Sequence, residues 1–192
     1  MERRFPVSDS EIVLVLGDLT RERTDAIANA ANSGLLGGGG VDGAIHRAAG
    51  PRLLEACREV KRTLPGGRLP TGEAVLTPGF DLAARFVVHC VGPVYAREGR
   101  QAPRLLARCY SNALRLCVEH GLDSVAFPSI STGVYGYPVD EAAPVALEAV
   151  REHLQRERRP ARVRFVLFDT ATLRAYQQAA DAVLTHRLTS KP

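Results

Sequence analysis

One glycine-rich stretch decides how this chain folds: Ser33-Gly-Leu-Leu-Gly-Gly-Gly-Gly-Val-Asp-Gly-Ala-Ile-His-Arg-Ala-Ala-Gly50. Four consecutive glycines, Gly37 to Gly40, lead directly into a helical pattern that carries Asp42 in its first turn and His46 one turn later. Glycine lets backbone amides approach a ligand without an intervening Cβ, and a helix start offers unpaired N–H groups and a partial positive charge. The stretch therefore predicts a phosphate site with an acid–base pair beside it.

Strand patterns precede this stretch, and strand and helix patterns alternate after it. Continuous apolar runs predict strands at 11–16, 26–29, 73–77, 86–91, 124–127 and 163–168, and helical spacing predicts helices at 41–62, 102–120, 139–155 and 170–187. Pro51 is expected to kink or interrupt the first of these helices. The alternation predicts an α/β fold with a largely parallel sheet covered on both faces. One domain is expected over 1–192, with its core at about 11–186.

A second glycine-containing element is Ser129-Ile-Ser-Thr-Gly-Val-Tyr-Gly-Tyr-Pro138, which follows a strand and precedes a helix. Its small hydroxyl residues and glycines can present backbone amides to phosphate oxygens, although a plain strand-to-helix loop would have a similar composition. Ligands of such sheets bind beyond the carboxyl ends of the strands. Two loops of this kind at one edge suggest a diphosphate held from both sides.

Four polar side chains near these loops have two interpretations each. Asp42 and His46 are four residues apart, so their side chains can meet on a helix, although a carboxylate in the first turn also stabilises a helix. Asn29 and Asn32 suit ribose hydroxyls because an amide both donates and accepts, but they also suit turns. We favour the functional interpretation of Asp42 and His46 beside two phosphate loops.

Asp18, at the end of the first predicted strand, has two interpretations that the local residues leave open. It can accept from the exocyclic amine of a base, or it can cap the turn that contains Thr20. Gly38-x-Gly40-x-x-Gly43 formally fits a dinucleotide fingerprint, but a true fingerprint follows its strand directly. Because several residues separate the glycines from the preceding strand, we reject that interpretation.

Composition and charge narrow the classes of function. Hydrophobic residues make up 45% and charged residues 24% of the 192 residues, as in soluble globular proteins. The formal net charge is +4, and the densest basic run, Arg151 to Arg164, contains two glutamates and no aromatic residue. A solvated helix face is expected there, so nucleic acid is not an expected partner. The longest apolar run, Ile12 to Leu16, is too short to span a bilayer, and the N-terminus lacks the features of a signal peptide.

The cysteines and histidines predict neither disulfides nor a metal site. No Cys-x-x-Cys pair occurs, and no histidine has ligand spacing to a cysteine. We expect reduced, buried thiols in a monomeric cytoplasmic protein without a cofactor. His89 lies in a predicted strand and is expected in the core. The cysteines concerned are Cys57, Cys90, Cys109 and Cys117.

At these residues the chain resembles the macrodomain family, specifically the MacroD-type ADP-ribose hydrolases. The resemblance rests on Gly17-Asp-Leu-Thr20, Asn29-Ala-Ala-Asn32, the stretch from Leu36 to Gly50, His89-Cys-Val-Gly-Pro93 and Ile130-Ser-Thr-Gly-Val-Tyr-Gly-Tyr-Pro138. It extends over about 11–184, nearly the whole chain. It implies a three-layer α/β/α fold around a mixed six-stranded sheet and a site for ADP-ribose.

The resemblance also implies roles for individual residues. Asp18 would bind the adenine amino group with the Leu19 backbone close by, and Phe168 would stack on adenine. The diphosphate would be held by Gly38, Gly39, Gly40 and Val41 and by Ser131, Thr132, Gly133 and Val134. Asn32 and Tyr135 would contact the distal ribose, and Asn29 would support the loop. Asp42 and His46 would form the catalytic pair, with Asn32 beside them, and the carboxylate at Asp42 distinguishes this type from macrodomains that only bind.

These roles predict hydrolysis of esters on the distal ribose of ADP-ribose. The expected substrates are O-acetyl-ADP-ribose and proteins mono-ADP-ribosylated on acidic side chains. Asp42 would orient or deprotonate a water, with His46 holding and tuning the carboxylate. Alternatively, a diphosphate oxygen would activate the water while Asp42 positions the sugar. The rival hypotheses are a non-catalytic ADP-ribose-binding module and a protein that binds RNA or regulates an RNase. The ligands of a zinc-dependent macrodomain class are not evident in the sequence.

Overall fold

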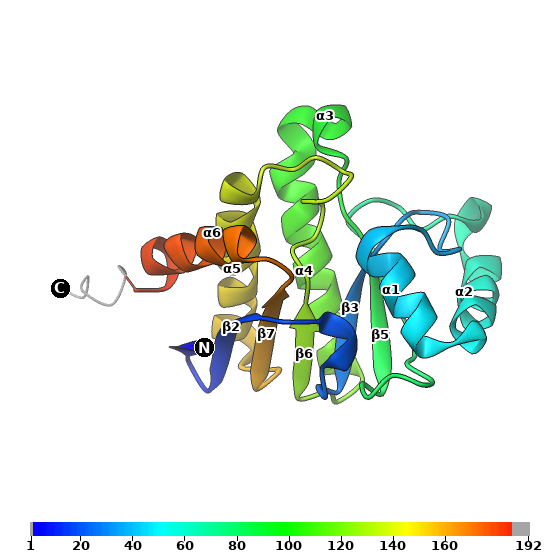
Figure 1. The fold of residues 1–192 in the computed structure, drawn as a ribbon, viewed down its shortest axis with the longest axis horizontal. Coiled ribbons are helices and arrows are strands. Elements are labelled where there is room, and N and C mark those ends of the chain that lie inside the picture. The colour runs from blue at the N-terminus through cyan, green and yellow to red at the C-terminus, as the bar shows by residue number, and fades with distance from the viewer. Residues whose placement is uncertain (1, 186–192) are drawn as a thin grey trace.

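The computed structural model describes residues 2–185 and forms one sheet of seven strands within them, in the order β1-β2-β7-β6-β3-β5-β4 (Figure 1). The strands are β1 (Arg3–Val7), β2 (Ser10–Leu16), β3 (Ala26–Ala31), β4 (Ala74–Pro78), β5 (Phe86–Val91), β6 (Ser124–Phe127) and β7 (Arg162–Leu167). The five central strands run parallel, whereas the edge strands β1 and β4 are antiparallel to their neighbours. The predicted mixed α/β sheet is confirmed, and the expected six strands are corrected to seven.

Six α-helices within the described residues connect or follow the strands. They are α1 (Gly40–Ala49), α2 (Pro51–Thr63), α3 (Tyr95–Glu98), α4 (Ala102–Glu119), α5 (Val139–Glu157) and α6 (Thr170–Ala180). Short 3₁₀ turns lie at η1 (Leu19–Arg21), η2 (Pro65–Gly67) and η3 (Gly99–Gln101), and a π-helical turn, η4, lies at Asp181–Thr185.

The structure confirms the expected interruption of the first predicted helix and corrects the end of the last one. The helix expected over 41–62 is two helices that meet at Gly50, because Pro51 cannot donate a backbone hydrogen bond and is tolerated only in the first turn of α2. The closing helix expected over 170–187 ends as an α-helix at Ala180. Its predicted residues 186 and 187 lie outside the described residues.

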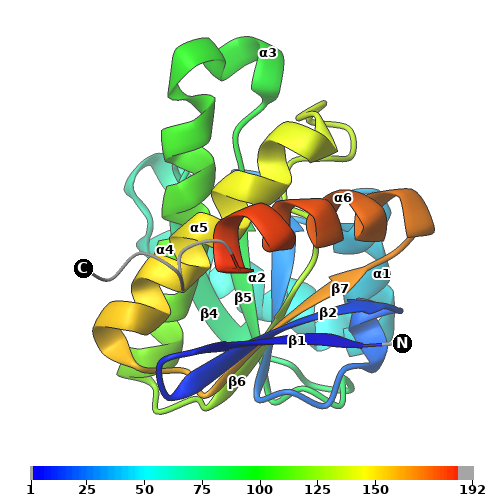
Figure 2. The same ribbon diagram turned by 90° about the vertical axis from the view of Figure 1, so that its left-hand side faces the viewer.

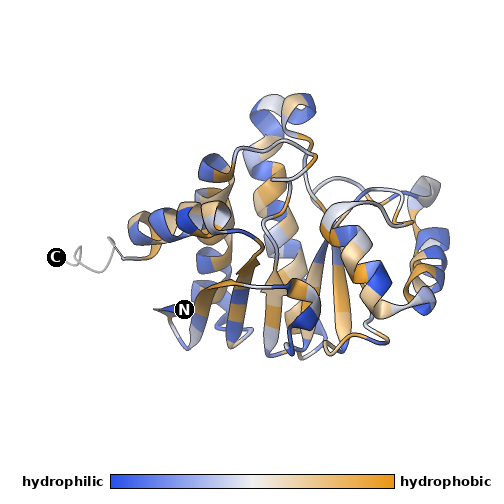
Figure 3. Ribbon diagram, viewed as in Figure 1, coloured by the Kyte–Doolittle hydropathy of each residue, from blue (hydrophilic) through white to orange (hydrophobic). Residues whose placement is uncertain are grey.

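The helices form a layer on each face of the sheet (Figures 1 and 2). One core packs α4, α5 and α6 against side chains such as Leu14, Val88 and Phe165. The other core packs α1 and α2 against Ile27 and Val87. Hydrophobic residues accordingly concentrate along the strands, and hydrophilic ones on the outer sides of the helices (Figure 3). All four cysteines are buried within the described residues and form no disulfide, as predicted.

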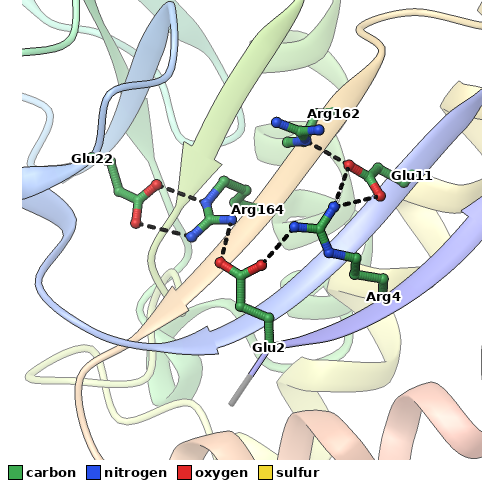
Figure 4. Close-up of polar contacts among 6 residues, drawn as sticks. All are labelled: Glu2, Arg4, Glu11, Glu22, Arg162 and Arg164. Carbon is green, nitrogen blue, oxygen red and sulfur yellow. Dashed lines mark hydrogen bonds and ion pairs between the residues drawn. The ribbon is translucent and has the colours of Figure 1, made fainter.

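The edge strand β1 was not predicted, because it begins with two arginines, Arg3 and Arg4, and contains Pro6, so its apolar pattern is too short. Pro is tolerated on an edge strand, where its missing N–H leaves no neighbour unpaired. Its position is fixed partly by a group of ion pairs that we call the edge network (Figure 4). Arg164 contacts Glu22 at 2.7 Å and Glu2 at 2.8 Å. The network consists of Glu2, Arg4, Glu11, Glu22, Arg162 and Arg164.

Figure 4 shows that the edge network joins β1, β2 and β7 to the segment after η1. Arg164 and Glu22 are the least exposed of its members, with side chains 14% and 16% exposed. Since Glu22 is the C-terminal cap of η1, this pair holds the turn that carries Asp18. No helix within residues 2–185 is long and apolar enough to cross a membrane.

Candidate active site

The predicted site residues follow strands whose carboxyl ends share one edge of the sheet. The glycine stretch follows β3, the loop 128–138 follows β6, Asp18 follows β2, and Phe168 follows β7. These four strands are parallel to one another. The topology therefore brings the four predicted segments to a single edge, as the sequence predicted.

Asp42 is a nearly buried carboxylate at this edge. It lies in the first turn of α1 and is only 5% exposed. Its Oδ1 accepts a hydrogen bond from Asn29 Nδ2 at 2.7 Å and lies 3.5 Å from His46 Nε2. Burial raises the pKa of Asp42, and the Asn29 hydrogen bond and His46 oppose that rise. The predicted approach of Asp42 and His46 is confirmed.

The glycine stretch is folded tightly against the start of α1. A Cβ at Gly43 would lie 2.5 Å from the Gly38 carbonyl oxygen, so a glycine is needed for this close approach. Gly39 is the N-cap residue, and within the described part of the chain no side chain caps the helix. Gly38, Gly39 and Gly40 are exposed. The first turn of α1 can therefore present backbone N–H groups to an anion.

The two asparagines of the Asn29–Asn32 motif make different contacts within the protein. Asn32 supports the glycine stretch, because its Nδ2 donates to the Gly37 carbonyl at 3.0 Å and its Oδ1 accepts from Gly34 N at 3.1 Å. Asn29 instead contacts Asp42 and His89 through its Nδ2. The expectation that Asn29 supports the loop stays a prediction, and the contact seen is with the first turn of α1. Asn29 lies on β3, below the loop, where its side chain reaches α1 rather than the glycines.

The second loop is held at its base and exposed at its tip. Ser131 is buried with φ of 68°, and a Cβ at Gly92 would lie 2.1 Å from its Oγ. This contact gives a physical reason for glycine in the His89–Pro93 segment. Thr132 Oγ1 donates to the Ser129 carbonyl at 3.0 Å. Gly133 and Val134 are exposed, with Val134 fully so, so the tip can meet a ligand.

Tyr135 leads from this loop back toward Asp42. Burial and the neighbouring Asp42 charge raise the pKa of Tyr135, which places the phenol in the electrostatic reach of the carboxylate. The Tyr135 carbonyl accepts from Tyr95 N at 2.9 Å, which ties the loop to α3. Tyr135 therefore belongs to the loop at the same edge of the sheet as Asp42 and His46.

Asp18, Leu19 and Phe168 form the far end of the predicted site. Asp18 Oδ1 accepts from Thr20 N at 2.9 Å and from Thr20 Oγ1 at 2.7 Å, so the capping interpretation is confirmed. The second oxygen, Oδ2, lies 3.8 Å from Arg21 Nε, and the Asp18 side chain is 52% exposed. Leu19 is buried, whereas Phe168 is 88% exposed. An aromatic ring so exposed at a strand end is available for stacking.

His89 was predicted as a core residue, and it is 1% exposed. It was not predicted as a neighbour of the site, although His89 and Asn29 are paired in register on β5 and β3. The two residues are 60 apart in sequence, so no local spacing indicates the contact. Within residues 2–185, no group of three His, Cys, Asp or Glu side chains is arranged to hold a metal ion.

Together these features define a three-layer α/β/α protein with two glycine-containing loops and a buried carboxylate at the carboxyl edge of its sheet. The Macro domain family matches this chain over residues 28–146, and the chain belongs to the macrodomain family. The resemblance seen in the sequence is thereby confirmed.

Similar proteins agree with this assignment. A macro domain-containing protein of Chlorobaculum tepidum is 54% identical over 88% of this chain and 94% of its own. A protein of Cronobacter turicensis named O-acetyl-ADP-ribose deacetylase is 50% identical over 87% of this chain and 94% of its own. The structure of the Oceanobacillus iheyensis macrodomain with ADP has a TM-score of 0.93 at 46% identity and covers 97% of this chain and 98% of that chain. The Trypanosoma brucei macrodomain in complex with ADP-ribose has a TM-score of 0.79 at 42% identity, covering 88% and 68% respectively.

Proposed function

We propose that this protein binds ADP-ribose and hydrolyses esters on its distal ribose, with O-acetyl-ADP-ribose as a substrate. The observation that carries the proposal is the buried Asp42 carboxylate, which follows an exposed glycine stretch and lies 3.5 Å from His46. In a module that only binds ADP-ribose, a carboxylate beside a diphosphate loop would repel the ligand without contributing to a reaction. The name of the Cronobacter turicensis relative supports the same activity.

The proposed binding mode uses the whole edge of the sheet. The amides of Gly38–Val41 and of Ser131–Val134 hold the diphosphate from its two sides. Asp18 and the Leu19 backbone bind the adenine amino group, while the exposed Phe168 ring stacks on the base. Asn32 and Tyr135 contact the distal ribose. The diphosphate thus fixes the position of an ester on that ribose relative to Asp42.

In the proposed reaction Asp42 acts on a water molecule. The carboxylate takes one proton as the water oxygen bonds to the ester carbonyl carbon. The ester C–O bond then breaks, the carboxylic acid leaves, and the ribose oxygen receives the proton. Burial raises the pKa of Asp42, which makes the group a better base near neutral pH. A diphosphate oxygen could replace Asp42 as the base, with Asp42 then positioning the sugar.

The same chemistry extends to proteins mono-ADP-ribosylated on acidic side chains. Such a linkage is also an ester on the distal ribose, so the same water and carboxylate serve both substrates. When the ester links ADP-ribose to a protein, the ester must reach Asp42 while the modified protein stays outside the two loops. The exposed Leu36 (48%) and Val134 (100%) at the loop tips are available to contact it.

The test compares the wild-type protein with Asp42→Ala. Release of acetate from O-acetyl-ADP-ribose should fall by about 10²–10⁴-fold in the variant, the range for loss of a general base. Calorimetry should show that ADP-ribose binding persists. Full turnover by the variant would exclude Asp42, and wild-type binding without turnover would favour the module that only binds. A steep salt dependence of RNA binding would instead support the RNA hypothesis.

A further inference from the structure

A line of hydrogen-bonded side chains runs from the edge strand β4 to Asp42. Thr77 on β4 lies 2.9 Å from His89 Nε2, through its Oγ1. His89 Nδ1 on β5 lies 3.2 Å from Asn29 Nδ2 on β3, and Asn29 Nδ2 lies 2.7 Å from Asp42 Oδ1 on α1. Thr77, His89 and Asn29 are all buried. The line thus crosses three adjacent strands beneath α1 and α2.

The chemistry of these groups fixes where each proton lies. A carboxylate can only accept, so the Asn29 amide presents Nδ2 rather than Oδ1 to Asp42. The second hydrogen of Nδ2 is directed at His89 Nδ1, which must therefore be the unprotonated nitrogen. Burial lowers the pKa of His89 to about 3, so the ring is neutral. Its one proton is on Nε2 and is donated to Thr77 Oγ1.

We propose that His89 is a positioning residue for the reaction, and that Thr77 sets its tautomer. His89 accepts from Asn29 and thereby keeps the amide nitrogen, not the amide oxygen, against Asp42. If the ring proton moved to Nδ1, the Asn29 amide would turn and place Oδ1 against the carboxylate. The expected effect on turnover rests on the proposed function. The hydrogen-bond geometry that joins Thr77, His89, Asn29 and Asp42 does not depend on that function.

Few other groups near His89 and Asp42 could replace the hydrogen bonds that lead from Thr77 through His89 and Asn29 to Asp42. The His46 ring on α1 lies 6.5 Å from the His89 ring between centroids. Cys57 on α2 lies 3.8 Å from His89 Nε2, through its Sγ, and burial followed by the Asp42 charge raises the pKa of its thiol to about 11. Tyr135 also faces Asp42 electrostatically. At neutral pH the thiol and the phenol are uncharged, so Asn29 and His46 are the groups that oppose the raised pKa of Asp42.

The first test replaces Thr77 by Val and, as the matched control, by Ser. Valine keeps the shape of threonine but removes the acceptor for Nε2–H, whereas serine keeps it. Thr77→Val should lower kcat for O-acetyl-ADP-ribose roughly tenfold, the order expected for one hydrogen bond to a charged group. It should also move the acidic limb of the pH–rate profile upward, because Asp42 loses a donor. Thr77→Ser should retain the wild-type rate and profile.

The second test replaces His89 itself by Asn and by Gln. The Asn oxygen can occupy the place of Nδ1 and accept from Asn29, whereas the Gln amide reaches the place of Nε2. His89→Asn should therefore keep more activity than His89→Gln, and a profile closer to wild type. Thermal melts of all variants separate loss of folded protein from loss of rate. A lowered melting temperature with unchanged kcat and pH profile in every variant would show a merely structural role and overturn the proposal.

One measurement does not depend on turnover. Carbon-13 NMR of the Asp42 carboxyl should show titration at higher pH in Thr77→Val than in wild type. Nitrogen-15 NMR should show the Nε2–H tautomer of His89 in wild type and in Thr77→Ser, but not in Thr77→Val. An identical Asp42 titration in both proteins would overturn the positioning role. Absence of turnover in wild type with the expected NMR shifts would instead refute the proposed function alone.

Discussion

Replacing Gly43 by Ala tests whether the position of the glycine stretch controls catalysis. The added Cβ would lie 2.5 Å from the Gly38 carbonyl oxygen and 3.1 Å from Arg47 Nη1. Carbon–oxygen contacts settle at about 3.3–3.6 Å, so the backbone at Gly38 must move by about 1 Å. A displacement of about 1 Å at a positioning element can lower a rate roughly 10²-fold, which corresponds to about 2.7 kcal/mol of activation free energy.

The helix itself should tolerate this change. Alanine is favoured over glycine inside a helix by about 0.8–1.0 kcal/mol, which opposes the strain at Gly38. We therefore expect a folded variant with kcat/KM for O-acetyl-ADP-ribose lower by about two orders of magnitude. Acetate release measures the rate, calorimetry with ADP-ribose measures the affinity, and a thermal melt measures the folded fraction.

The control is Ala48→Gly, which weakens α1 at an exposed position away from the glycine stretch. It should lower the melting temperature and leave kcat/KM unchanged at temperatures where the protein is folded. Wild-type kcat/KM together with wild-type affinity in Gly43→Ala would refute the reasoning, because the contact with Gly38 would then have no effect on the reaction.

Two further predictions follow from burial and exposure at the site. Because burial raises the pKa of Asp42 above its unfolded value, its folded form binds the proton more tightly, and stability is lost as pH rises through the folded pKa. Asp42→Asn should therefore melt at a higher temperature than wild type at pH 7, and this difference in melting temperature should shrink as the pH falls toward 3. A difference that does not change with pH would contradict this prediction. Phe168→Ala should weaken ADP-ribose binding by about 1–3 kcal/mol, the usual value of one stacked base, without altering ribose 5-phosphate binding or the melting temperature, since the ring is 88% exposed. Equal losses for the two ligands in calorimetry would remove Phe168 from the adenine site.

The sequence was sufficient for the central strands because each contains a predominantly apolar run. It was insufficient for β1, where Arg3, Arg4 and Pro6 interrupt the apolar pattern, and where pairing with β2 and the edge network decide the conformation. The four-residue helix α3 (Tyr95–Glu98) was also missed, since a single turn has no measurable period.

The contacts of the candidate site likewise include some that the sequence predicts and others that it does not. Asp42 and His46 lie on one helix, so their spacing predicts their approach. The contacts of Asn29 with Asp42 and His89 depend on the register of parallel strands far apart in sequence. No local pattern contains that register, which explains why His89 was assigned to the core alone. Residue type alone does not distinguish Asn29 from Asn32, because both suit turns and ribose equally, and only the family resemblance gave them separate roles.

The edge network also has a consequence for association between molecules. Most of its ion pairs are open to solvent, so dissolved salt weakens them by screening, whereas Phe5 packs partly against the core from the other side of β1. If β1 came away, the outer border of β2 would present unpaired N–H and C=O groups, which is a template for pairing with another chain. Strand β1 (Arg3–Val7) thus covers the border of β2 against pairing with another chain, besides completing the sheet.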